Sequence, residues 1–373
     1  AQARGLEAPA AWQGVEPDAG ARAVAESLAS GERVAVWLGN AALQHPQAGA
    51  LAAAVQWIAQ ALGARWGAPG EAANTVGGYL AEAMPRDGGL AAGPMLAAPR
   101  RAYLLLGCEP DCDFADARLA RSAMAAADSV IALSAYRSAD LLELADCLLP
   151  VAPFTETAGT FVNCEGRVQA FTGVVRPLGE SRPAWKVLRV LANLVGATGF
   201  DHDSSESVRS ELLDGDDVSA RLSNRLELEP TAIGAGAAEG AIERVADVPI
   251  YFVDPLVRRA ESLQQTADAR VPRAWMAPAL MQRLGIAAGD RVRLRQEGSG
   301  AAGGEDGDVL LEAAADDRLP HQVVRVAAAH RSTAGLGPMF GTVTVERVAP
   351  PQGDEAAQPE AAGVAAPGAA GKG

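Results

Sequence analysis

The chain has 373 residues, of which 49% are hydrophobic and 21% are charged. This length and balance are typical of a globular protein with two or three domains, which needs no disulfide to hold its core. With 32 basic and 46 acidic residues the net charge is −14, which excludes a protein that binds nucleic acid through its overall charge. The four cysteines are too few for a disulfide-stapled secreted scaffold.

The N-terminal sequence has no targeting or membrane-spanning pattern. It begins without Met and lacks the basic and apolar regions of a signal peptide. The longest apolar stretch, residues 51–62, contains Gln56 and Gln60 and is shorter than the ~20 apolar residues that a membrane span needs. We expect residues 1–20 to be the lead-in of a piece whose N-terminal part lies upstream.

The next part of the chain alternates between apolar runs and helical spacing. Apolar runs typical of strands lie at residues 33–38, 102–106, 129–133 and 147–151, and helical spacing lies at 47–62, 114–127, 138–145 and 182–195. Continuous apolar strands separated by helices predict a parallel sheet that is covered on both faces. Residues 21–200 are therefore predicted to form an open, doubly wound α/β region.

The pattern changes after residue 200. Residues 201–269 are predicted to be an acidic linker with short helices and one strand at 250–253. A helix is predicted at 278–284, strands at 291–295, 309–313, 323–327 and 342–347, and a hairpin loop at 298–308. Short strands in this arrangement predict a small β-barrel over residues 270–348. Residues 349–373, rich in Ala, Pro, Gly and Gln, are predicted to be a disordered tail.

Several segments together resemble one superfamily. They are residues 107–113 (GCEPDCD), 144–169 (LADCLLPVAPFTETAGTFVNCEGRVQ), 179–196 (GESRPAWKVLRVLANLVG) and 276–294 (MAPALMQRLGIAAGDRVRL). Over residues 20–348 the chain resembles the molybdopterin oxidoreductases. It is most similar to the C-terminal half of the large peripheral-arm subunits of NADH-quinone oxidoreductase, the bacterial respiratory complex I.

This resemblance implies two α/β domains around a pterin-shaped cleft, capped by a C-terminal barrel of the double-psi type. In active members the cleft holds molybdenum or tungsten on a bis-molybdopterin guanine dinucleotide. In the complex I branch the iron–sulfur clusters lie upstream, and this region is a scaffold without the cofactor. The complex passes electrons from NADH through those clusters to quinone and translocates protons.

The resemblance also implies a setting for the chain. Its partners would be other peripheral-arm subunits, with no nucleic acid and no direct insertion into the membrane. It would lie on the cytoplasmic side of the bacterial inner membrane. Two alternatives remain: the C-terminal part of an active molybdopterin-dependent oxidoreductase such as formate dehydrogenase, or a non-catalytic binding module on this fold. In the active enzyme the residue that ligates the metal would lie upstream.

Six residues are candidates for the remains of the cofactor cleft, and none is a candidate for catalysis or metal binding. Gly107 follows a strand, at the sheet edge where open α/β sheets bind ligands. Glu109 stands where active family members carry a Gly-x-Asn-Pro pattern, and its carboxylate would repel a pyrophosphate. This difference favours a structural turn.

The other candidates, Asn163, Glu165, Arg167 and Gln169, form a polar run that lies at the cleft in the family. Arg167 could pair with a phosphate while Asn163 reads a ring edge. Alternatively, Glu165 and Arg167 could pair with each other and fix a loop. Cys108 and Cys112 are spaced like metal ligands but have no second cysteine pair, so we expect free thiols.

Overall fold

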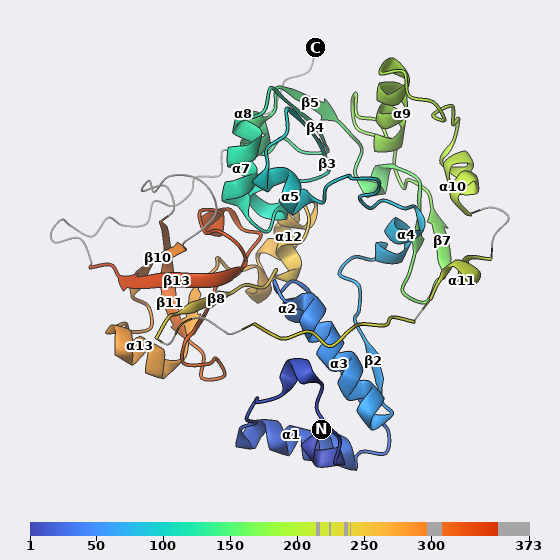
Figure 1. Cartoon of the computed structure of the whole chain (residues 1–373). Helices are drawn as coiled ribbons and strands as arrows, with labels where there is room; N and C mark the ends of the chain where they lie inside the picture. Colours follow the sequence, from blue (N-terminus) through green and yellow to red (C-terminus); the bar gives the residue numbers. More distant parts are fainter. Residues whose placement is uncertain (214–216, 224, 235–237, 239, 297–307, 350–373) are drawn as a thin grey trace.

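The computed structural model describes residues 1–213, 217–223, 225–234, 238, 240–296 and 308–349. Figure 1 shows an N-terminal segment, an α/β body, a peripheral lobe and a C-terminal barrel. Within the described ranges, no helix has the length and apolar character needed to cross a membrane.

The N-terminal segment is built around a two-stranded parallel sheet. Its elements are η1 (Gln2–Arg4), η2 (Ala10–Trp12), α1 (Ala19–Ser30), β1 (Ala35–Trp37), α2 (Asn40–Leu43), α3 (Ala48–Leu62) and β2 (Arg65–Gly67). Strand β1 pairs with β2, and α3 forms the crossover between them. Trp12 packs edge-on against Trp57 of α3, so the start of the chain rests on this helix.

The α/β body is a three-stranded parallel sheet in the order β3-β4-β5. It comprises α4 (Thr75–Leu80), α5 (Ala92–Ala97), β3 (Ala102–Leu106), α6 (Pro110–Asp113), α7 (Ala117–Ala125), β4 (Ser129–Ser134), α8 (Ala139–Leu144) and β5 (Cys147–Pro150). Asp116 and Ser138 cap the N-termini of α7 and α8 through backbone amides. Met124, Val130 and Leu141 are buried in one core between these helices and the sheet.

The peripheral lobe carries an antiparallel hairpin and three helices. Its elements are η3 (Phe154–Glu156), β6 (Gly159–Val162), β7 (Val168–Phe171), α9 (Ala184–Leu194), α10 (Ser205–Leu213) and α11 (Val218–Arg221). The hairpin is tied to α4 because the Asn74 side chain accepts a 2.8 Å hydrogen bond from the Val162 amide. Figure 1 shows α9 and α10 at the edge of the molecule.

Between the lobe and the barrel, residues 249–264 form a connecting segment that we call the strap. It contains η4 (Ile250–Phe252), η5 (Val257–Arg259) and α12 (Glu261–Gln264), and η6 (Ala267–Ala269) follows it. The Gln264 side chain donates hydrogen bonds to the carbonyls of Tyr251 and Val257, which hold the strap together.

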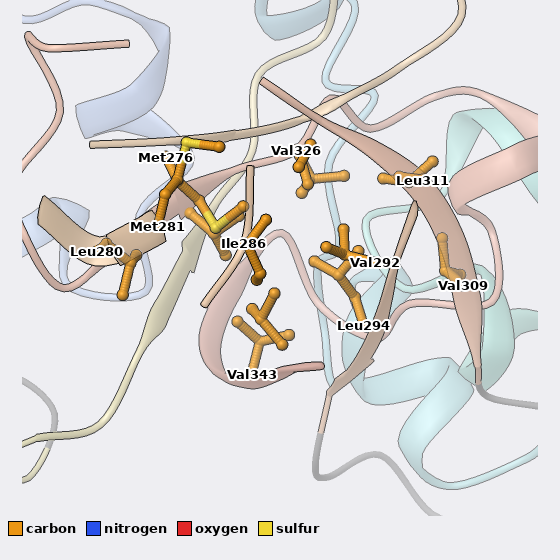
Figure 2. Close-up of a cluster of buried hydrophobic side chains, with 14 of the residues drawn as sticks. Met276, Leu280, Met281, Ile286, Val292, Leu294, Val309, Leu311, Val326 and Val343 are labelled. Atoms are coloured by element: carbon orange, nitrogen blue, oxygen red, sulfur yellow. The ribbon is translucent and has the colours of Figure 1, made fainter. Parts of the chain in front are cut away.

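The barrel is closed by six strands in the order β10-β11-β9-β12-β8-β13. Its elements are β8 (Glu243–Val245), β9 (Ala274–Met276), α13 (Pro278–Leu284), β10 (Arg291–Gln296), β11 (Val309–Ala315), β12 (Val323–Arg325), η8 (Arg331–Thr333) and β13 (Phe340–Arg347). Figure 2 shows its core, where Val292, Leu294, Leu311 and Val343 converge.

The expected fold class, an α/β region with parallel sheets followed by a small barrel, is confirmed. The strands of the first part form two separate parallel sheets, however, and not the one sheet that the alternation predicted. The strand predicted at 250–253 is wrong, because this short apolar run is the 3-10 helix η4. The predicted hairpin loop at 298–308 and the predicted tail lie almost wholly outside the described residues.

The barrel also starts earlier than residue 270. Strand β8, in the stretch predicted to be linker, pairs with β12 and β13 and closes the barrel. Its Arg244 is buried and donates 3.0–3.1 Å hydrogen bonds to Gln296 and to the carbonyls of Gly337 and Pro338. Burial lowers the pKa of Arg244 to about 10. A three-residue strand centred on an arginine has no apolar pattern by which the sequence could reveal it.

Replacing Leu294 with Ala should lower the free energy of unfolding by ~2–5 kcal/mol, because it leaves a cavity in the barrel core. Leu294 is fully buried. Leu310 on the neighbouring strand is 43% exposed, and Leu310→Ala should change that free energy by less than ~1 kcal/mol. Denaturant unfolding of both variants measures the difference, and equal losses would contradict the barrel register.

Candidate functional site

The candidate site begins where β3 ends. Gly107 turns the chain with a φ of 66°, a left-handed conformation that favours glycine, and its amide donates to the Leu133 carbonyl at 2.8 Å. Glu109 then precedes the short helix α6, and its amide donates to the Asp113 carboxylate at 2.6 Å. This turn places two acidic side chains at the carboxyl end of the sheet.

Glu109 is only 1% exposed and is neutralised by two arginines of the strap. Arg258 Nη1 lies 3.1 Å from Glu109 Oε2, and Arg259 pairs with Glu109 Oε1. Arg258 also pairs with both oxygens of Asp113. Glu109, Asp113, Arg258 and Arg259, the Glu109 cluster from here on, thus combine two carboxylates with two guanidinium groups and are balanced in charge.

The cluster fixes the charge state of Arg258. Burial disfavours the charged guanidinium, but the hydrogen bond and charge of Asp113 outweigh it, with help from Glu109, so the pKa of Arg258 is raised. Arg258 Nε also donates to the Phe252 carbonyl at 2.8 Å. Because this arginine binds the sheet end and its own strap at once, it fastens the strap to the α/β body.

Arg259 makes a second connection. Its guanidinium lies 4.3 Å from the centre of the Tyr136 ring, a cation–π geometry, and Nη1 donates to the Pro255 carbonyl at 2.9 Å. Tyr136 follows β4, so the strap reaches across the carboxyl ends of two neighbouring strands. Burial raises the pKa of the Tyr136 hydroxyl.

A second group of charges supports α6 from the other side. Arg121 of α7 binds Asp111 through two hydrogen bonds of 2.6 and 3.0 Å. The Asp111 amide donates to Asp140, a fully buried carboxylate. Burial alone would raise the pKa of Asp140, but hydrogen bonds led by that of the Asp111 amide outweigh it, so the pKa is lowered. The acidic side chains at this sheet end are therefore held by partners from their own chain.

Beside the Glu109 cluster lies a cleft of about 570 Å³ between the N-terminal segment, the α/β body and the barrel. It touches the carboxyl ends of β1 and β3, where open α/β sheets bind ligands. Its lining residues are Asn40, Gln44, Pro46, Glu71, Ala72, Cys112, Asp113, Phe114, Ala115, Val248, Val253, Ala328, Ala329, Pro338, Met339 and Phe340.

The residues of this cleft do not fit the pyrophosphate of a pterin dinucleotide. Among the described lining residues, the charged side chains are Glu71 and Asp113, and there is no Lys or Arg. A pyrophosphate needs cationic or amide donors, and carboxylates repel it. The nearest guanidinium of the cluster, Arg258, is already engaged by Asp113 and Glu109.

The remaining candidates lie elsewhere, in the turn of the β6–β7 hairpin. Figure 1 shows β7 well apart from β3. The Asn163 side chain accepts hydrogen bonds from the amides of Glu165 and Arg167, at 3.0 and 2.9 Å, and closes the turn. The structure thus separates Gly107 and Glu109 from the hairpin residues that the sequence grouped with them.

The alternative in which Glu165 and Arg167 pair with each other finds no support among the ion pairs of the described residues. Both side chains are exposed, as is Gln169, and the described residues give neither charge an ion-pair partner. Asn163 fixes this turn through the backbone instead. An Asx-turn of this kind is held by backbone amides and needs no charged side chain.

Nothing in the sequence pattern pointed to Arg258 and Arg259. They lie 149 and 150 positions from Glu109, and they sit in a segment that was predicted to be linker. Two adjacent arginines usually belong to a solvated surface, so only the folded chain reveals their buried partner.

Replacing Arg258 with Met should lower the free energy of unfolding by ~3–5 kcal/mol, because Glu109 would lose one of its two cationic partners while still buried. Adding Glu109→Gln should restore part of that loss, since the uncompensated carboxylate is removed. Denaturant unfolding of the single and double variants measures the coupling. Arg101→Met, which breaks an exposed pair with Asp128, is the control and should cost ~0–1 kcal/mol.

The four thiols should differ in reactivity. Burial raises the pKa of both Cys108 and Cys112 to about 11, with the charge of Asp113 contributing in each case, so at pH 8 these thiols stay protonated. Cys147 and Cys164 are exposed. With a disulfide reagent at pH 8, two thiols should react at once and the other two only after unfolding. Rapid modification of Cys108 or Cys112, located by mass spectrometry, would contradict the partly buried environment of Cys108 and the buried one of Cys112.

Comparison with known proteins gives several partial matches. Residues 18–194 match the family model described as molybdopterin oxidoreductase. The 78 kDa subunit of mitochondrial NADH-ubiquinone oxidoreductase from Neurospora crassa is 29% identical over 157 residues, which cover 37% of this chain and 20% of that protein. The probable oxidoreductase YjgC of Bacillus subtilis is 47% identical over 55 residues, covering 15% of this chain and 6% of that protein.

A putative formate dehydrogenase of Staphylococcus aureus is 46% identical over 52 residues, covering 14% of this chain and 5% of that protein. The matches thus span one fifth or less of the length of these curated relatives. Among solved structures, acetylene hydratase from Pelobacter acetylenicus aligns with a TM-score of 0.48 at 15% identity, over 68% of this chain and 46% of that one. Residues 18–194 of the chain, just under half of its length, are thus similar to the molybdopterin oxidoreductase family.

Proposed function

We propose that the chain is a scaffold part of the large peripheral-arm subunit of NADH-quinone oxidoreductase. The whole enzyme would oxidise NADH, pass electrons through iron–sulfur clusters to quinone and translocate protons. In this proposal the clusters belong to other parts of the subunit, and the chain carries neither electrons nor a pterin cofactor. Its task is to hold the α/β body, the lobe and the barrel in a fixed arrangement.

One observation carries the proposal. The carboxyl end of β3, where the family's active members face their cofactor, holds the buried Glu109 with two arginines of the same chain around it. The buried carboxylate of Glu109 needs these cationic partners, since a buried unpaired charge costs several kcal/mol. Moving the strap away to admit a ligand would leave Glu109 buried without its arginine partners. The cluster therefore favours a permanent structural role.

A second line of support comes from the relatives. The longest of the reported matches, 157 residues, is to a subunit of NADH-ubiquinone oxidoreductase. Among the described residues, no group of three or more His, Cys, Asp and Glu side chains could hold a metal ion.

The proposal includes partners and a location. The partners would be other subunits of the peripheral arm, with no role for nucleic acid, in agreement with the net charge of −14. The chain would lie on the cytoplasmic side of the bacterial inner membrane and reach the membrane only through the complex.

A second candidate is the C-terminal part of an active molybdopterin-dependent oxidoreductase such as formate dehydrogenase. It is favoured by the higher identity, 46% and 47%, of the short matches to the putative formate dehydrogenase and to YjgC. In that case the residues of the 570 Å³ cleft would have to accept a dinucleotide despite Glu71 and Asp113.

Cofactor analysis separates the two candidates. The chain, purified from cells that make molybdenum cofactor, should contain no stoichiometric molybdenum, tungsten, iron or extractable pterin, because its sheet end is filled by the Glu109 cluster. Elemental analysis by mass spectrometry and pterin fluorescence after oxidation measure this. An active molybdopterin enzyme purified from the same cells shows that cofactor was available. One pterin per chain would refute the scaffold proposal and support the formate dehydrogenase-like alternative.

A further inference from the structure

The peripheral lobe and α4 together form a pocket of about 260 Å³. It is bounded by residues of α4, of β6, of the first turn of α9 and of α10. Figure 1 shows α4, β7 and α10 on the same side of the molecule. Pockets for drug-sized ligands have volumes of about 300–1,000 Å³, so this one suits a smaller molecule.

The walls of this pocket are mostly apolar. Leu80 of α4 and Val162 of β6 are buried beside it. The large apolar side chains that line it are Leu80, Val162, Trp185, Val208, Leu212 and Leu213. Such walls favour a ligand with an apolar body, because binding removes the apolar surface of both partners from water.

One charge faces this apolar space. Among the described lining residues, Arg209 of α10 is the charged one, and its side chain is half-buried. Its guanidinium makes no hydrogen bond or ion pair with any described residue. Asn74 also lines the pocket, and its Oδ1 is already used by the Val162 amide, which leaves its amide nitrogen as a donor. The pocket thus combines apolar walls with unused donors.

The acidic residues of α10 do not neutralise Arg209. Glu211 is paired with His202 at 2.8 Å. Glu206 is exposed, accepts a 3.1 Å hydrogen bond from Ser205 Oγ and lines an adjoining cavity of about 190 Å³, which Arg209 also touches. The pKa of Glu206 is lowered first by its own amide and by Ser205, and only last by the charge of Arg209.

Charge and shape together select the ligand. A neutral apolar molecule would cover the guanidinium without giving it a partner, and an amine would be repelled by it. A phosphate would bring about two negative charges to a wall with a single cation. A carboxylate carries one charge and can accept two parallel hydrogen bonds from a guanidinium.

We propose that this pocket binds a small monocarboxylic acid with an apolar body, of about the size of 3-phenylpropionate. The carboxylate pairs with Arg209, and the apolar body lies between the side chains of α4, β6 and α10. The site goes beyond the scaffold role. Its described lining residues include no member of the Glu109 cluster, so it stands whether or not the scaffold proposal holds.

The probe is 3-phenylpropionate, titrated into the whole chain and followed by ligand-observed NMR. It should bind at least about tenfold more tightly than 3-phenylpropionamide, which has the same shape without the charge. It should also bind at least about tenfold more tightly than propionate, which keeps the charge but lacks the ring. The two comparisons test the charged and the apolar halves of the site separately.

Arg209→Met should weaken binding of the acid by at least about tenfold, to the level of the amide, because it removes the cation and keeps the length of the side chain. Binding of the amide should not change, which shows that the variant keeps its pocket. The matched control is Arg118→Met, at another half-buried helix arginine outside the described lining of the pocket, and it should leave both affinities unchanged.

Ala81→Phe tests the location independently of charge. Ala81 lines the pocket and is exposed, so a larger side chain can occupy the space without disturbing the core. This variant should weaken binding of both the acid and the amide by at least about tenfold. Ala83→Phe, at an exposed alanine outside the described lining, is its control and should change neither.

Three results would overturn the proposal. One is the absence of saturable binding of the acid at millimolar concentration. Another is equal affinity for the acid and its amide in the parent chain. The third is unaltered binding of the acid to the folded Arg209→Met or Ala81→Phe variant, because the acid would then bind elsewhere.

Discussion

The ion pairs between Glu109 and the two arginines of the strap are the contact on which the arrangement of this protein depends. Glu109 has almost no access to water, so its charge is tolerated only while Arg258 and Arg259 remain in place. These contacts join residues 149 and 150 positions apart and fasten a segment of short helical turns to the α/β body. Strand β9 of the barrel follows soon after that segment.

The same contacts explain how a sheet edge where ligands bind in other α/β proteins can be occupied here by side chains of the chain itself. The carboxyl ends of parallel strands point toward one edge, and ligands bind there in open α/β sheets. Here the strap brings its own cations to the edge, and Arg259 also covers the ring of Tyr136. Among the described residues, the adjoining cleft has only carboxylates as its charged lining groups. An anion arriving there would meet repulsion where an active enzyme offers donors.

Much of the fold could be predicted from the sequence because periodic patterns are local. The strand Ala102–Leu106 and the helix Pro278–Leu284 have the predicted bounds, since an apolar run and a Pro-to-Gly helical segment each carry their own signal. Strand β8 and the 3-10 helix η4 could not be predicted. The first depends on a buried arginine that is satisfied by distant carbonyls, and the second on tertiary contacts that a four-residue apolar run does not specify.

The site was predictable only in part. Gly107 and Glu109 could be placed at a strand end, but the partners of Glu109 lie in another region of the sequence and carry no motif. The Asn163–Gln169 run was grouped with them through family resemblance, whereas in this chain Asn163 closes a surface hairpin. Short-range spacing predicts which residues form turns. Only the folded structure shows which charged side chains form ion pairs.

Calorimetric titration of guanosine diphosphate into the purified chain tests most directly whether the sheet end is closed by its own arginines. This nucleotide carries the pyrophosphate and guanine of the family's cofactor without its metal. With Glu109 paired to Arg258 and Arg259, the titration should give no saturable heat. Saturable binding at micromolar concentration that Arg258→Met abolishes would show that these arginines serve a ligand, and would contradict their structural role.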